Sequence, residues 1–156
     1  MIQPFESVMM RTLLGPMVAA LQIFALYVVV HGHYSPGGGF QGGVLFGASI
    51  VLPLLVQGRR SGFFVLSQRA AIVMAAGGVL VFLAFGLFGP LAGQPVLDYA
   101  AVPLGDYPAY RRSLSILGIE IGVTMAVAGS VVSIFYILYE EVNVETDPKP
   151  ATEEPR

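Results

Sequence analysis

The sequence contains no cysteine and no tryptophan, and only 12% of its 156 residues are charged. The absence of cysteine excludes disulfides, thiolate metal sites, iron–sulfur clusters and cysteine nucleophiles. So few charges cannot cover the surface of a water-soluble domain, which normally carries about a quarter charged residues. With a net charge of −2, the chain also lacks the basic surface that nucleic-acid binding requires. A mean hydropathy of +0.74 instead indicates an integral membrane protein.

Long uncharged runs predict an all-α integral membrane protein with four transmembrane helices and a Gly-rich loop between helices 1 and 2. Three runs can cross the hydrocarbon core of about 30 Å, and the second span does so only if its helix begins near Phe40. The expected spans are approximately 13–30, 40–57, 70–91 and 114–139. They form one membrane domain, residues 1–142, and an acidic, Pro-rich tail follows at 143–156.

The distribution of basic residues predicts that both termini lie in the cytoplasm. With four spans, six of the eight Lys and Arg residues fall on the side of the termini, and only Arg111 and Arg112 fall on the other side. Cytoplasmic loops carry the excess of positive charge in membrane proteins. No basic leader or small-residue cleavage site accompanies the first span, so we expect it to be an uncleaved anchor.

The segment between the first two spans, from His31 to Gly43, has five glycines within its last seven residues. It formally contains G-x-G-x-x-G, but no strand precedes it, so we do not expect nucleotide binding. Glycines permit positive φ and close backbone approach. Irregular backbone at membrane depth must be covered by protein or face water. The loop is therefore either a surface turn or, the interpretation we favour, an element with a specific packing or ion-facing role.

Two histidines, His31 and His33, lie in this segment. Two histidines without a neighbouring carboxylate or cysteine are too few for a metal site, so we expect neither a metal nor a cofactor. A histidine near the membrane surface can exchange a proton at physiological pH. His33, nearer the Pro-Gly turn, is the candidate proton-relay residue.

Glu120 is the one charged residue inside the last expected span. A carboxylate in a spanning helix is costly and therefore marks a candidate functional site. Thr124, one turn further along the same face, is a second candidate for the ion path. The alternative is structural, because Glu120 lies roughly 9 Å below the expected helix start and could pair with Arg111, Arg112 or a basic residue of another subunit.

Small residues recur every four positions on two spans: Gly118, Gly122, Ala126 and Ser130 on the last, and Gly43 and Gly47 on the second. Such stripes let helix backbones approach closely. Glu120 lies off the stripe on its helix, so two faces of that helix have a role, which suggests partner subunits. Gln22 and Ser49 are weaker polar candidates, expected to form interhelical hydrogen bonds.

From Gly32 to Gly43 the sequence reads G-H-x-x-P-G-G-G-F-Q-G-G, directly after a first span. This run resembles the B subunit of Mrp-type multisubunit cation/proton antiporters, the MnhB-like family, and the resemblance covers about residues 5–140. Related modules occur in membrane-bound respiratory hydrogenases. The family pattern extends to these positions: His33, Pro36, Gly37, Gly38, Gly39, Phe40, Gly42 and Gly43. It assigns no role to Glu120.

The resemblance implies a non-enzymatic subunit of the prokaryotic plasma membrane. Its partners would be larger membrane subunits, and the complex would exchange Na⁺ for H⁺. The sequence itself shows no catalytic nucleophile–base pair or paired carboxylates. Two functions stay open. The subunit supports assembly and contributes Glu120, His33 and Thr124 to the ion path, or it is a purely structural scaffold, including that of a redox-driven relative such as a membrane-bound hydrogenase.

Overall fold

The computed structural model describes residues 8–32, 34, 37–57, 66–103 and 106–146. These residues form four α-helices: α1 (Val8–Val30), α2 (Gly39–Gln57), α3 (Gln68–Leu91) and α4 (Pro108–Thr146). Each helix is long and apolar enough to cross a membrane. The all-α class and the four candidate spans predicted from the sequence are therefore confirmed.

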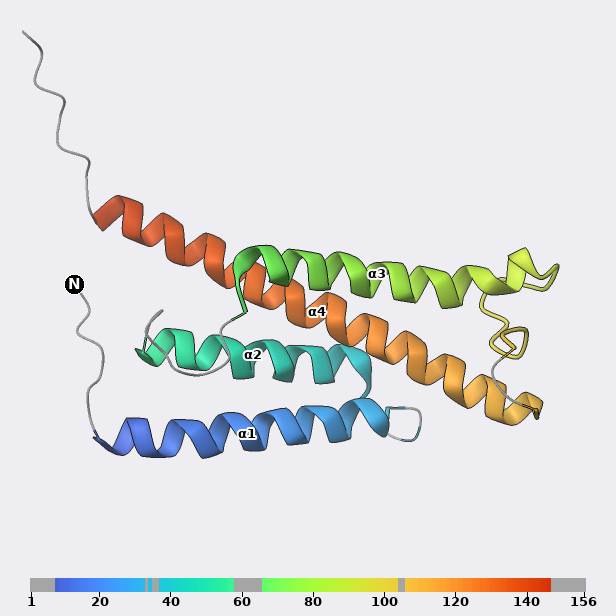
Figure 1. The fold of residues 1–156 in the computed structure, drawn as a ribbon, viewed down its shortest axis with the longest axis horizontal. Helices are drawn as coiled ribbons and strands as arrows, with labels where there is room; N and C mark the ends of the chain where they lie inside the picture. Colours follow the sequence, from blue (N-terminus) through green and yellow to red (C-terminus); the bar gives the residue numbers. More distant parts are fainter. Residues whose placement is uncertain (1–7, 33, 35–36, 58–65, 104–105, 147–156) are drawn as a thin grey trace, which may run out of the picture.

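The helices lie in an open row rather than in a closed bundle (Figure 1). Their order in the row is α1, α2, α4, α3. The last helix in sequence, α4, packs against both α2 and α3, whereas the backbones of α2 and α3 make no close contact within the described part of the chain. Most of each span remains outside the core, and only 17% of the α3 span is buried.

The fourth helix is much longer than the expected span at 114–139. It has 39 residues, which correspond to about 58 Å of helix, against about 30 Å of hydrocarbon. It runs obliquely across the row (Figure 1), and its charged residues other than Glu120 lie near its two ends, at Arg111 and Arg112 and from Glu140 onward. The charges therefore mark the edges of the apolar stretch but do not end the helix. Residues 143–146 of the expected tail are helical.

Glycines bring α4 close to its neighbours. On the α3 side, a Cβ added at Gly122 would lie 2.9 Å from the main-chain oxygen of Gly78, and a Cβ at Gly78 would overlap the backbone of α4. Gly118 faces the ring of Phe85, also on α3. Ser130 is exposed and its hydroxyl donates to the oxygen of Ala126 in its own helix. The stripe thus packs, up to Ala126, against a helix of the same chain.

The second stripe packs α2 against the other side of α4. A Cβ at Gly43 would lie 2.9 Å from the main-chain oxygen of Thr124, and a Cβ at Gly47 would lie 2.8 Å from Val131. Both stripes are thus used inside the chain. The surfaces left for lipid or for other subunits carry large apolar side chains, among them Ile23, Val73 and Leu80.

We predict that Gly78→Ala destabilises the protein while its neighbour Gly77→Ala does not. The new methyl group at position 78 would overlap backbone atoms of α4, whereas at position 77 its nearest neighbour would be the flexible end of Met125, 3.9 Å away. Overpacking of this kind costs about 1–3 kcal/mol. Thermal unfolding of the two variants in detergent measures the difference, and equal midpoints would contradict the packing described for α3 and α4.

Candidate functional site

The side chain of Glu120 lies against the connection between α1 and α2. A Cβ at Gly32, just after α1, would overlap both carboxylate oxygens, and a Cβ at Gly38 would lie 3.4 Å from Oε1. The Oε2 atom of Glu120 is buried. Two features that the sequence presents separately, the Gly-rich segment and the intramembrane carboxylate, therefore form one site.

The backbone of α4 at Glu120 touches the first residue of α2. A Cβ at Gly39 would overlap the main-chain oxygen of Glu120 and lie 2.9 Å from its Cα. The hydroxyl of Thr124 shares its one proton between the main-chain oxygens of Glu120, 2.7 Å away, and Gly39, 3.1 Å away. The hydrogen bond from Thr124 thus links α4 to the first residue of α2.

At three positions around Glu120 the structure requires a glycine. Gly32 and Gly39 leave the space that Glu120 fills with its carboxylate and its backbone, respectively. Gly38 has φ +126°, a left-handed conformation that L side chains rarely adopt. Gly32 is not among the predicted site residues, although it is the first residue of the glycine motif and directly follows the end of a span.

The helix geometry places a favourable electrostatic field at the Glu120 carboxylate. The helix α2 begins at Gly39, and its first hydrogen bonds include the one from the amide of Gly42 to the oxygen of Gly38 at 2.9 Å. The N-terminus of a helix carries partial positive charge, which stabilises a nearby anion by about 0.3–1 kcal/mol or somewhat more when buried. This field offsets part of the cost of a carboxylate in a span. Pairing of Glu120 with Arg111 or Arg112 stays a prediction.

The remaining residues of the glycine motif have other surroundings. Gly42 packs against Ala25 and Val29 of α1, and Phe40 is exposed. Candidates His33 and Pro36 lie outside the described residues, and their proposed roles stay predictions. Within the described ranges, no group of three or more His, Cys, Asp or Glu residues could hold a metal ion.

His31 lies at the end of α1 with its ring stacked on that of Tyr27, the ring centroids being 4.2 Å apart. Its Nδ1 is 3.1 Å from the main-chain oxygen of Tyr27. Because a carbonyl oxygen only accepts hydrogen bonds, Nδ1 carries the proton in this contact. The side chain is exposed. Its contacts are thus with its own helix.

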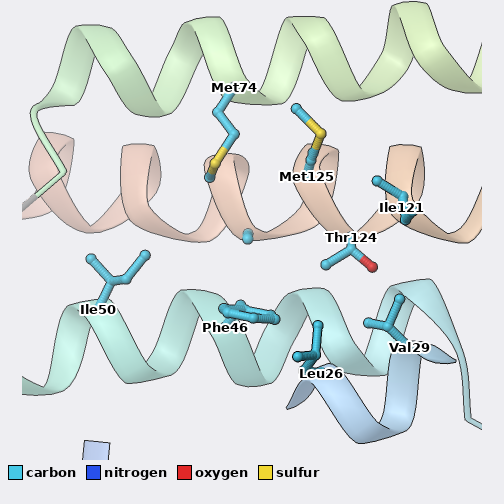
Figure 2. A pocket seen from close by; sticks show the side chains of 9 residues that line it. Leu26, Val29, Phe46, Ile50, Met74, Ile121, Thr124 and Met125 are labelled. Atoms are coloured by element: carbon cyan, nitrogen blue, oxygen red, sulfur yellow. The ribbon is translucent and has the colours of Figure 1, made fainter. Parts of the chain in front are cut away.

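An apolar cavity of about 270 Å³ lies beside the site (Figure 2). Side chains from all four helices line it: Leu26, Val29, Phe46, Ile50, Met74, Ile121, Thr124, Met125 and Ala128. Thr124 belongs both to this lining and to the contact between Gly39 and Glu120. An apolar lining of this kind gives an ordered water no hydrogen-bond partners. The Glu120 site is therefore bounded by glycine backbone on one side and adjoins a hydrocarbon-lined space.

Four candidate spans and a carboxylate enclosed within one of them are features typical of integral membrane proteins that move ions. The chain belongs to the MnhB family: residues 9–133 match the family described as a domain related to the MnhB subunit of Na⁺/H⁺ antiporter. This match confirms the resemblance that the run from Gly32 to Gly43 indicates.

Two relatives cover most of the chain. It is 28% identical over 146 residues to the B subunit of the Na⁺/H⁺ antiporter from Alkalihalophilus pseudofirmus, an alignment that spans 87% of this chain and 94% of the relative. It is 30% identical over 124 residues to the B subunit of the Na⁺/H⁺ antiporter from Bacillus subtilis, spanning 76% and 83% of the two chains. The similarity thus extends over most of each relative.

Proposed function

We propose that this chain is a non-catalytic membrane subunit of a multisubunit Na⁺/H⁺ antiporter, and that it contributes Glu120 to the ion path. The observation that carries the second part is the enclosure of the Glu120 carboxylate by Gly32 and Gly38 within a candidate span. Ionisable residues kept inside membranes line ion and proton pathways. The names of the relatives support Na⁺ and H⁺ as the transported ions.

The arrangement of the helices also supports a role of this chain in assembly with other membrane subunits. The four helices enclose little interior of their own, since the spans of α1 and α3 are only 22% and 17% buried. The apolar cavity beside Glu120 offers no polar lining for an ion. The polar continuation of the path therefore comes, in this proposal, from a partner subunit. The excess of basic residues on the side of the membrane that holds the termini supports a cytoplasmic position for both ends.

The direct test of the ion-path role is Na⁺/H⁺ exchange in everted membrane vesicles that carry Glu120→Gln, with recovery of the complex measured in parallel. The alternative function, a scaffold without contact with ions, predicts that any loss of exchange follows a loss of assembled complex. The exposed position of Phe40, next to the residue that contacts Glu120, supports a role of the motif in assembly.

We predict that Phe40→Ala lowers recovery of the complex and lowers exchange in the same proportion. Phe40 is 65% exposed at the start of α2, and loss of an aromatic anchor at a subunit interface costs about 2 kcal/mol or more. Leu55, also 65% exposed but near the other end of α2, gives the matched control Leu55→Ala. Quantitative affinity purification measures recovery. Normal recovery of the Phe40 variant would remove this side chain from the interface.

A further inference from the structure

We propose that Glu120 takes up and releases a proton and does not bind Na⁺. This inference rests on the proposed function, since it names which of the two transported ions uses the Glu120 site. It follows from three properties of the surroundings of the carboxylate: the space around it, the direction of the nearest helix dipole and the chemistry of the adjoining cavity.

The space around the carboxylate suits a proton. The backbone of Gly32 lies so close that even a methyl group there would overlap both oxygens, and Gly38 approaches Oε1 from the same connection. A Na⁺ ion needs a shell of several oxygen ligands around it, and hard cations are held in this way by carboxylates, carbonyls and water. A proton needs only one carboxylate oxygen. With main-chain atoms at contact distance, there is room for a proton on the carboxylate but not for the oxygen ligands that Na⁺ needs.

The partial charge at the nearest helix end is positive, which disfavours a bound cation. Intramembrane Na⁺ sites are built from unwound carbonyls and the C-terminal ends of helices, whereas N-terminal ends point at anions. Glu120 lies against Gly38 and Gly39, at the N-terminus of α2. The partial positive charge there stabilises the carboxylate and repels Na⁺. The same charge also opposes protonation, but a proton needs no shell of oxygen ligands and leaves the carboxyl group neutral.

The adjoining cavity supplies no further ligands for Na⁺. Its lining is hydrocarbon and thioether except for the hydroxyl of Thr124. The one proton of that hydroxyl is already shared between the main-chain oxygens of Glu120 and Gly39. Soft thioethers such as those of Met74 and Met125 are poor ligands for Na⁺. The cavity thus offers Na⁺ no ligands on this side of the site.

Within the described residues, few other titratable groups lie on the elements packed around the site. The segment Gly39–Gln57 of α2 has no charged residue, and α3 has only Arg69, in its first turn, whereas α3 contacts Gly118 through Phe85, about four turns away. At the end of α1, the ring of His31 stacks on Tyr27. The remaining charged groups on the connected elements are Arg11 on α1, Asp98 and Asp106 in the connection to α4, and Arg111, Arg112, Glu140, Glu141 and Glu145 on α4 itself. Among these described groups, Glu120 is the carboxyl whose oxygens lie against Gly32 and Gly38.

The test is modification of Glu120 by dicyclohexylcarbodiimide, an apolar reagent that attacks protonated carboxyl groups. The assembled complex is treated over a series of pH values, once in NaCl and once in an equal concentration of choline chloride, and the Glu120 peptide is quantified by mass spectrometry. We expect modification to fall as the pH rises and to be the same in both salts. The exposed Glu140, on the same helix, serves as the internal reference.

Two results would overturn the proton assignment. Protection of Glu120 by NaCl but not by choline chloride would show that Na⁺ occupies the site. Glu120 would then still belong to the ion path, but as a ligand of Na⁺ rather than as a proton carrier. Absence of modification at every pH at which the complex exchanges ions would show that the carboxyl takes up no proton. Failure of the proposed function has a different signature, because Glu120 would be modified normally while Glu120→Gln retained full exchange.

Discussion

Replacement of Gly39 by alanine should disrupt the joint between α2 and α4 and remove most of the assembled, active complex. The new Cβ would overlap the main-chain oxygen of Glu120 and lie 2.9 Å from its Cα. Both obstacles are backbone atoms of a long helix, so no side-chain rotation can relieve the overlap. We expect a cost at or above about 3 kcal/mol, the upper end for overpacking. Recovery of the complex and thermal stability in detergent measure the effect.

The control for Gly39 is Gly93→Ala. Gly93 has φ +73°, so alanine is strained there, yet no atom lies within 4 Å of the added Cβ. If Gly39→Ala is the more damaging of the two, the cause is the contact with α4 and not the general loss of a glycine. Equal stability of the two variants would mean that α2 does not approach Glu120 as closely as the structure shows.

The second large effect is expected for Glu120→Gln. Glutamine has almost the volume of glutamate and preserves the contacts with Gly32 and Gly38, so the complex should assemble. It cannot take up or release a proton. We expect Na⁺/H⁺ exchange per assembled complex to fall by about 10²-fold, the low end of the contribution of a positioned proton-transfer group. Exchange is followed in everted vesicles by the collapse of a pH gradient on addition of NaCl.

The matched control for Glu120 is Glu140→Gln, which removes an exposed carboxylate from the same helix. It should leave both exchange and assembly unchanged. Full exchange by the Glu120 variant would remove the carboxylate from the ion path and favour the scaffold function. A loss of exchange that only follows a loss of complex would lead to the same conclusion.

The sequence predicts the spans because each depends on local composition alone. Uncharged runs such as 70–91 correspond to helices that the structure places within a few residues, here Gln68–Leu91. The fourth helix differs most, since Arg111, Arg112 and Glu140 mark the edges of the apolar run but are compatible with a helix that continues to Thr146. Charged residues mark where the apolar stretch that crosses the membrane stops, whereas the end of a helix depends on backbone capping and on residues such as proline.

The candidate site is only partly predictable from the sequence. Composition singles out Glu120 and the glycine segment, each for its own reason. Their contact joins Gly32, Gly38 and Gly39 to Glu120 and depends on how α4 packs between α2 and α3, which no local pattern encodes. The same limit applies to the stripe that includes Gly118 and Gly122. Its spacing predicts close packing, but the identity of the neighbour, α3 of the same chain, requires the tertiary structure.

The most direct test of the central claim is the composition of the particle that contains this chain. The tagged protein is expressed with its native neighbours, extracted in mild detergent and analysed by native mass spectrometry and peptide identification. We expect an assembly with several other membrane subunits that catalyses Na⁺/H⁺ exchange after reconstitution. A stable particle composed of this chain alone, or an assembly that carries redox cofactors and does not exchange Na⁺ for H⁺, would contradict the proposed function.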